Sequence, residues 1–206
     1  VPSAQFLREY LNLIEAKEGG KVVDLKFRDK KRGWGALINL TIQKNDGKIF
    51  HKYLSTNESY YYYYYWGGNL YRPSCYNCKY AQRPRFSDFT IGDFWGVNLL
   101  ALPLDEKKGV SVILANTSKA KEMIPKLEPY IDFHDSSLEE AIKQNGQLSS
   151  SSKHKPENYF LWYIYEQHGA KGLADYYSSV HRKQIIIGIL KRKMPLSLKR
   201  ILKRFL

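Results

Sequence analysis

The order of apolar and polar residues at the start of the chain predicts a helix followed by strands. Ser3 can cap a helix whose apolar residues recur at helical spacing as far as Ile14, and Gly19 with Gly20 is suited to end it. Alternating and β-branched residues predict strands at 21–28, 34–43 and 48–54. Asn45-Asp46-Gly47 is a strong hairpin signal between the last two strands. The chain is therefore expected to begin with an antiparallel unit that has short connections.

Residues 57–66 contain six consecutive tyrosines and end in Trp66. A helix with aromatic side chains on all sides is either buried in the core or lies against a flat ligand. We expect a helix packed on the core, with a flat ligand beside it as the alternative.

Helical patterns dominate the rest of the chain. A short strand is expected near Asp88, ending in a Gly-Asp turn. The further elements expected are a buried strand at 109–115, a helix from Thr117 to Leu127, a strand at 130–134, a helix capped by Ser136 or Ser137 that runs to Gln144, and a loop at 146–153. Aromatic-rich helices follow Pro156 and break near Gly169, and a last basic helix is interrupted near Pro195.

These patterns predict the α+β class, with mostly antiparallel strands packed with helices in the first two-thirds and a helical C-terminal part. Two domains are expected, one at 1–155 and a helical extension with a basic tail at 156–206.

Composition places the chain among ordinary globular proteins. Its 206 residues are 43% hydrophobic and 26% charged, and no run of roughly 18 apolar residues occurs, so no membrane-spanning helix is expected. There is no signal-peptide pattern, and because the first residue is Val1 we expect the chain to begin inside a longer polypeptide. Two cysteines are too few for a secreted disulfide scaffold, which favours a reducing, cytoplasmic setting.

The net charge of +13 is unevenly spread along the chain. Nine lysines and arginines and no acidic residue lie in 182–206, which leaves +4 of the +13 for the first 181 residues. The near-balanced charge of the first 181 residues, the body of the chain, argues against nucleic-acid binding. In 196–206, apolar residues keep the spacing of one helix face between cations, as in a helix that lies on an anionic membrane surface. Docking on an acidic partner, or on another part of the same protein, is the alternative.

Cys75-Tyr76-Asn77-Cys78 is a C-x-x-C pair. Two thiolates at this spacing can bind one metal ion or one iron–sulfur cluster, while redox-dithiol chemistry and incidental cysteines stay open from the residues alone. Zinc or a cubane cluster needs about four ligands. No second cysteine pair exists and the five histidines are scattered, so further ligands would have to come from elsewhere.

Two other segments carry candidate binding residues. Asp93, with Trp95 just beyond it, forms either a ligand rim or a turn in which the aspartate caps backbone amides and the tryptophan fills the core. Arg28-Asp29-Lys30 with Gly33-Trp34 is either a cationic loop for a phosphate or a flat ring, or a solvated turn that the tryptophan anchors.

Together these segments resemble the coenzyme F420 hydrogenase/dehydrogenase beta-subunit family, in its C-terminal domain. The order and spacing agree over roughly residues 1–145. The matching stretches are Val1-Pro2-Ser3, Phe27 to Lys30 with Gly33-Trp34, Arg72 to Cys78, Ser87 to Gly96, and Lys108 to Ser111 with Asn116-Thr117.

The resemblance implies an FAD-binding oxidoreductase with a [4Fe–4S] cluster, in which the flavin exchanges a hydride and the cluster carries single electrons. Cys75 and Cys78 would be cluster ligands, with the other cysteines supplied by the protein's own N-terminal half. The positions expected near the flavin or the substrate are Arg28, Lys30, Arg85, Asp88, Asp93 and Trp95. An electron-transfer partner such as ferredoxin is also implied.

The tyrosine run and the basic tail are more similar to a bacterial branch found among glycan-building enzymes than to methanogen hydrogenase subunits. A cell-surface polysaccharide precursor is therefore the preferred substrate, and coenzyme F420 is a less favoured coenzyme. The competing hypotheses are a non-catalytic, membrane-docked module of polysaccharide assembly and a zinc-stabilised nucleic-acid binder. The paired cysteines favour a redox enzyme over the docking module, and the charge of the body weighs against the nucleic-acid binder.

Overall fold

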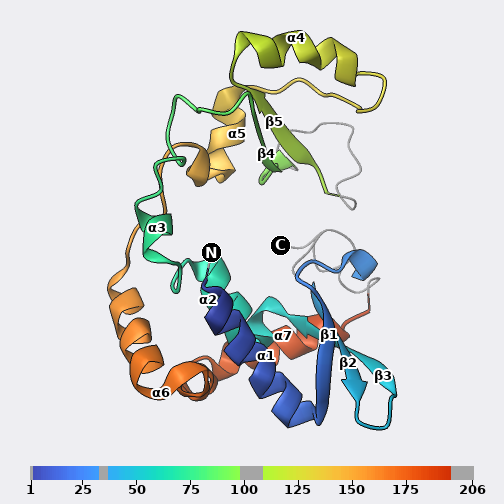
Figure 1. Ribbon diagram of the computed structural model, residues 1–206, viewed down its shortest axis with the longest axis vertical. Helices are drawn as coiled ribbons and strands as arrows, with labels where there is room; N and C mark the ends of the chain where they lie inside the picture. The colour runs from blue at the N-terminus through green and yellow to red at the C-terminus, as the bar shows by residue number, and fades with distance from the viewer. Residues whose placement is uncertain (1, 33–36, 98–108, 196–206) are drawn as a thin grey trace. The chain divides into compact units, whose positions relative to one another are not determined.

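The computed structural model of the chain describes residues 2–32, 37–97 and 109–195 (Figure 1). Some predicted features therefore lie outside the described residues, namely Val1, Gly33-Trp34 with the first residues of the strand predicted at 34–43, Lys108, and the tail at 196–206. The chain forms two compact units. Unit 1 combines residues 1–72 with the residues from 154 onward, and unit 2 is Pro73–Lys153. The division into a family domain at 1–155 and an extension at 156–206 stays a prediction.

Unit 1 begins with α1 (Ala4–Glu18), as the sequence predicts. The Ser3 hydroxyl accepts a hydrogen bond from the backbone N–H of Phe6, which satisfies one of the amides left open at the start of a helix. Gly19 ends the helix at φ 64°, in the left-handed conformation that glycine adopts without strain. Phe6 and Tyr10 turn into the core.

A three-stranded antiparallel sheet follows, in the order β1 (Gly20–Lys26), β2 (Leu37–Lys44) and β3 (Ile49–Ser55). The predicted hairpin is confirmed, and its turn closes through a 2.9 Å hydrogen bond from the Gly47 N–H to the Lys44 carbonyl oxygen. Alternate residues of β2 (Ile38, Leu40 and Ile42) are buried together with Tyr62. The period-2 alternation of the sequence thus places one face of β2 on the core.

The tyrosine run forms α2 (Tyr60–Gly67), which Ser59 caps at its start and Gly68 ends. Four of its six tyrosines are buried, so the prediction of a helix packed on the core is confirmed. Burial raises the pKa of Tyr61 to about 12 and raises that of Tyr64 still further. The hydroxyl groups of Tyr61 and Tyr64 therefore stay uncharged well above neutral pH, as an apolar core requires.

The C-terminal helices α6 (Pro156–Val180) and α7 (Arg182–Lys193) complete unit 1. The predicted break is present, because Gly169 has non-helical backbone angles with φ at 61°. Side chains of α6 join Phe6, Tyr10 and the α2 tyrosines in one cluster; they are Leu161, Ile164, Ala170, Leu173 and Tyr177. No helix among the described residues is long and apolar enough to cross a membrane.

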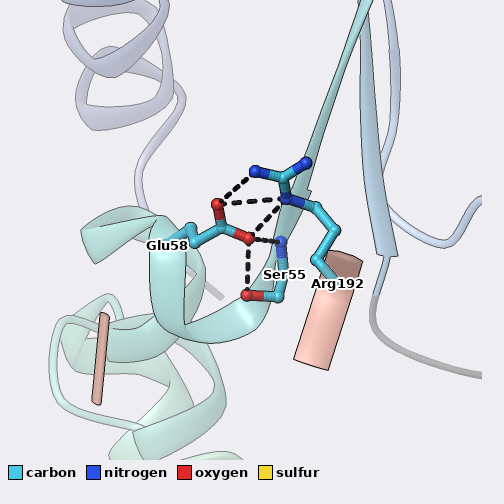
Figure 2. Close-up of polar contacts among 3 residues, drawn as sticks. All are labelled: Ser55, Glu58 and Arg192. Carbon is cyan, nitrogen blue, oxygen red and sulfur yellow. Dashed lines mark hydrogen bonds and ion pairs between the residues drawn. The ribbon is translucent and has the colours of Figure 1, made fainter. Parts of the chain in front are cut away.

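A partly buried ion pair fastens α7 to the turn after β3 (Figure 2). The guanidinium of Arg192 donates to both carboxylate oxygens of Glu58, at 2.8 to 3.1 Å. The same carboxylate accepts hydrogen bonds from the backbone N–H and the hydroxyl of Ser55. Burial by itself raises the pKa of Glu58, but the hydrogen bonds from Arg192 and Ser55 outweigh it and hold the pKa below its ordinary value.

Unit 2 contains α3 (Pro73–Tyr76), the antiparallel pair β4 (Phe89–Asp93) and β5 (Ser111–Ala115), α4 (Ser118–Leu127) and α5 (Leu138–Gln144). Thr117 and Ser137 cap the last two helices, as predicted. With unit 1, this gives the predicted α+β class.

Two expectations for unit 2 are wrong. Only Val112 of β5 is buried, because in the described part of the unit β5 belongs to a two-stranded sheet whose other strand is β4. Residues 130–134 form no strand. The backbone N–H groups of Tyr130 and Ile131 instead bond to the Leu127 carbonyl oxygen, so the end of α4 continues as a turn and leaves Tyr130 84% exposed.

Candidate functional site

The two cysteines lie in a turn of unit 2 that is held in place by hydrogen bonds. Cys75 is in α3, Cys78 follows two residues after this helix, and Tyr76 between them is only 5% exposed. The Ser151 hydroxyl donates to the Tyr76 carbonyl oxygen at 2.7 Å, and the Ala81 N–H donates to that of Cys78 at 3.1 Å. Both thiols are half-buried and neither forms a disulfide. The turn is thus held by Ser151 and Ala81, and both cysteines are half-buried within it.

This donor set fits a metal centre only in part. Two thiolates with one short turn between them are suited to bind the same ion or cluster. In the described portion of the chain, no group of three or more His, Cys, Asp or Glu residues comes together. The pair can therefore supply two ligands of a centre that takes its others from outside the described residues.

Arg85 braces the loop that follows the cysteines. Its guanidinium donates to the carbonyl oxygen of Tyr80 and, at 2.7 Å, to that of Gln147. Arg83 and Arg85 also line an open hollow of about 270 Å³ beside Asn116 at the end of β5. The charge of Arg85 is therefore fixed in position at the rim of a surface hollow.

Asp88 links the start of β4 to the start of α4. Its carboxylate accepts a 2.6 Å hydrogen bond from the Thr117 hydroxyl and lies 3.4 Å from the Lys119 ammonium nitrogen. The hydrogen bond from Thr117 is the largest cause of its lowered pKa, and Lys119 adds to it. Thr117 also accepts from the Ala120 N–H, so one hydroxyl caps α4 and holds Asp88.

Asp93 and Trp95 lie where β4 ends. Asp93 is the last residue of the strand and pairs with Ser111 of β5. Phe94 is the aromatic residue that fills the core here, at 5% exposure, whereas Trp95 is half-buried. The Asn145 side chain donates to the Trp95 carbonyl oxygen at 3.4 Å. Asp93 and Trp95 therefore lie together at the end of the strand, where the Trp95 N–H donates to the Asp93 carbonyl oxygen at 3.1 Å.

Arg28 and Lys30 belong to unit 1. The Arg28 guanidinium carbon lies 5.4 Å from the ring centroid of Trp66, at the end of the tyrosine helix. Asp29, between the two cations, accepts from the Lys31 N–H and from the Asn39 side chain, both at 2.8 Å. The backbone bond from Lys31 is the largest cause of the lowered pKa of Asp29. This carboxylate orders the loop that carries both cations.

The structure thus brings the predicted residues into two groups. Arg28 and Lys30 are in unit 1, whereas the cysteines, Arg85, Asp88, Asp93 and Trp95 are in unit 2. Sequence reasoning missed Asn39, Thr117 and Ser151 as supports of these residues, although Thr117 was predicted as a helix cap. Only the cap carried a local signal, because the other contacts join residues 10 and 75 positions apart.

A known protein family matches most of the chain. The model that describes the C terminus of the coenzyme F420 hydrogenase/dehydrogenase beta subunit matches residues 1–138. This range contains every predicted site residue, and α6 and α7 lie beyond it. No curated protein and no solved structure matches the chain significantly.

Proposed function

The chain belongs to the coenzyme F420 hydrogenase/dehydrogenase beta-subunit family, and from this premise we propose that it relays electrons between a [4Fe–4S] cluster and FAD. Membership of the family makes it a domain of an oxidoreductase-related beta subunit. The observation that carries the finer proposal is the C-x-x-C turn inside the matched range, with two half-buried cysteines that form no disulfide and the buried Tyr76 between them.

Cys75 and Cys78 provide two cluster ligands, and the protein's own N-terminal half provides the rest. When bound, the cluster carries single electrons and the flavin exchanges a hydride or single electrons. The chain's own contribution is to fix the two sulfur atoms. Tyr76 holds the turn by its burial and Ser151 holds it by its hydrogen bond. Such outer contacts orient metal ligands in general.

Each of the six predicted positions offers a contact to the flavin or to the substrate. Arg28 and Lys30 supply positive charge to phosphate groups, for which guanidinium and ammonium donors are suited. Asp93 accepts hydrogen bonds, and Trp95 offers an aromatic face to a ring. Arg85 and Asp88 present charges that Gln147 and Thr117 already hold in place.

The substrate class in this proposal is a precursor of a cell-surface polysaccharide, and a ferredoxin-like protein exchanges electrons with the cluster. Coenzyme F420 is the less favoured alternative as hydride partner. The tail at 196–206 contacts an anionic membrane, supported by its alternating cations and apolar residues.

The test is an anaerobic absorption spectrum of the native protein, together with its iron and flavin content. The variants Cys75→Ser and Cys78→Ser are expected to lose the broad cluster absorption and the iron while they keep the flavin. Asn77→Ser changes the exposed residue between the cysteines and should leave both signals intact. A protein that stays colourless after reconstitution with iron, sulfide and FAD would reject the redox function in favour of the non-catalytic module.

A second set of variants tests the flavin contacts. Alanine at Arg28, Lys30, Arg85, Asp88, Asp93 and Trp95, one position at a time, is expected to lower flavin content or activity at some of them with iron unchanged. Wild-type flavin content and activity in all six would reject their assignment without affecting that of the cysteines.

A further inference from the structure

Helix α7 presents two different faces. With about 100° between successive residues of a helix, the exposed positions fall on one half of its circumference and the less exposed positions on the other. The outward half consists of Arg182, Lys183, Ile186, Ile187, Leu190, Lys191 and Lys193. Its three aliphatic residues are 45 to 58% exposed, which is unusual for neighbouring large apolar side chains on one helix.

The inward face is fixed by two contacts one turn apart. Gly188 is buried, and a Cβ atom there would lie 2.6 Å from the Ser55 hydroxyl oxygen and 2.9 Å from Cβ of Asn57. Only glycine permits this close approach of α7 to the turn after β3. Arg192 then closes the bidentate pair with Glu58 (Figure 2). The helix therefore cannot rotate its aliphatic residues inward without breaking both contacts.

The charge of the outward half has a single sign. It carries four cations, and α7 contains no acidic residue. Arg182 and Lys193 lie on one side of the three aliphatic residues, Lys191 lies on the other, and Lys183 lies among them. Aliphatic side chains flanked by cations match the boundary between the acyl chains and the anionic headgroups of a phospholipid surface.

From this arrangement we infer that the outward half of α7 is a docking face for an anionic phospholipid membrane. The aliphatic residues enter the headgroup boundary while the cations contact phosphates, and unit 1 holds the helix parallel to the surface from its other side. The inference concerns described residues only. It depends neither on the tail at 196–206 nor on the proposed redox function. A nucleic-acid partner fits less well, because it would leave the exposed isoleucines and leucine without contacts.

The experiment is co-sedimentation of the purified protein with vesicles of phosphatidylcholine, with and without phosphatidylglycerol. Binding is expected only to the anionic vesicles and should weaken as salt is raised. The triple variant Arg182→Gln, Lys183→Gln, Lys191→Gln should lower the partition coefficient about a hundredfold, since each cation near the surface contributes about 1 kcal/mol. Ile186→Ser with Ile187→Ser and Leu190→Ser should also lower binding at least tenfold.

Matched controls use exposed residues outside α7. Replacing Lys26, Lys121 and Lys126 by glutamine removes the same charge, and Ile49→Ser with Ile91→Ser removes exposed aliphatic surface; both should bind as the wild type does. Circular dichroism checks that each variant is folded. A variant that ends at Pro195 should still bind anionic vesicles, more weakly than the whole chain.

Three results would overturn the inference. The α7 variants could bind vesicles as the wild type does, or the chain ending at Pro195 could lose all binding, which would assign the membrane to the tail. Alternatively, the α7 variants could keep vesicle binding but lose a stable complex with another protein, which would make the occupant a protein.

Discussion

Glu58 and Arg192 show how much of unit 1 depends on a single pair of residues. The side chain of Glu58 is 7% exposed and that of Arg192 is 27% exposed, so removing either partner leaves a poorly solvated charge. We expect Arg192→Gln to lower the free energy of unfolding by about 2 kcal/mol, less than for a fully buried pair. Urea denaturation measures the loss, and Lys191→Gln, at an exposed neighbouring position, should change it little.

The same pair predicts a pH dependence. The folded-state pKa of Glu58 lies below its ordinary value of 4.5. A carboxyl group of this kind stabilises the fold above its unfolded pKa, and the stabilisation is lost as the pH falls through the folded value. The difference in stability between wild type and Glu58→Gln should therefore be constant near neutral pH and shrink below about pH 4.5. A difference that grows on acidification would contradict this.

At Thr117 one hydroxyl has two partners, which makes it a sensitive position in unit 2. Thr117→Val removes both the cap of α4 and the hydrogen bond to Asp88. A lost cap costs about 1 kcal/mol, and unit 2 should be destabilised by at least this amount in chemical denaturation. Thr117→Ser keeps the oxygen and is the control.

Asp88→Asn keeps an acceptor for the Thr117 hydroxyl and should leave the melting temperature nearly unchanged. Any loss of flavin in this variant therefore reports on binding.

Within α2, the tyrosine run contains a matched pair of buried hydroxyl groups. The Tyr62 hydroxyl donates to the Phe27 carbonyl oxygen at 2.8 Å, whereas the buried Tyr64 hydroxyl has no hydrogen-bond partner among the described residues. Tyr62→Phe should therefore destabilise the fold by about 1 kcal/mol, and Tyr64→Phe should be neutral or stabilising, because it removes an unsatisfied polar group. Denaturation curves of the two variants decide this. Equal losses would mean that the Tyr64 hydroxyl has a partner elsewhere.

Elements with local signals could be predicted from the sequence, and those that depend on distant partners could not. Ser3, Gly19 and the Asn45-Asp46-Gly47 turn fix their own backbone within a few residues, and the structure confirms the elements they delimit. The strand expected at 130–134 has a suitable composition but pairs with no strand in the described part of the chain, and its first two residues continue the end of α4 as a turn.

The same distinction holds for the site. The cysteine turn is a local pattern, and the sequence locates it directly. The supports of the site residues depend on tertiary contacts, such as that of Tyr76 with Ser151, and no periodicity indicates them. The pairing of Glu58 with Arg192 could not be predicted from the sequence either. The two residues are 134 positions apart, and each alone has the character of an exposed helix or turn residue.

For the whole molecule, the decisive feature is that unit 2 is inserted into unit 1. The two segments of unit 1 that flank the insertion contact each other. The Asn69 side chain donates to Glu157 at 3.0 Å and to Asn158 at 3.3 Å, and the Lys155 ammonium group donates to the Gly67 carbonyl oxygen at 2.8 Å. The segment that precedes unit 2 and the segment that follows it are thus joined by hydrogen bonds within unit 1. Its core cluster likewise unites α1 and α2 with α6.

Because each unit has its own buried residues, we expect the two units to unfold as separate cooperative units. Hydrogen exchange measured peptide by peptide tests this. Arg192→Gln should speed exchange in α1, the three-stranded sheet and α6 while β4 and β5 keep wild-type rates, and Thr117→Val should produce the reverse pattern. Each variant serves as the control for the other, since each changes one unit and leaves the sequence of the other unit unchanged. If either substitution sped exchange equally in both units, the chain would unfold as one cooperative body. The insertion would then draw its stability from unit 1 instead of from its own core.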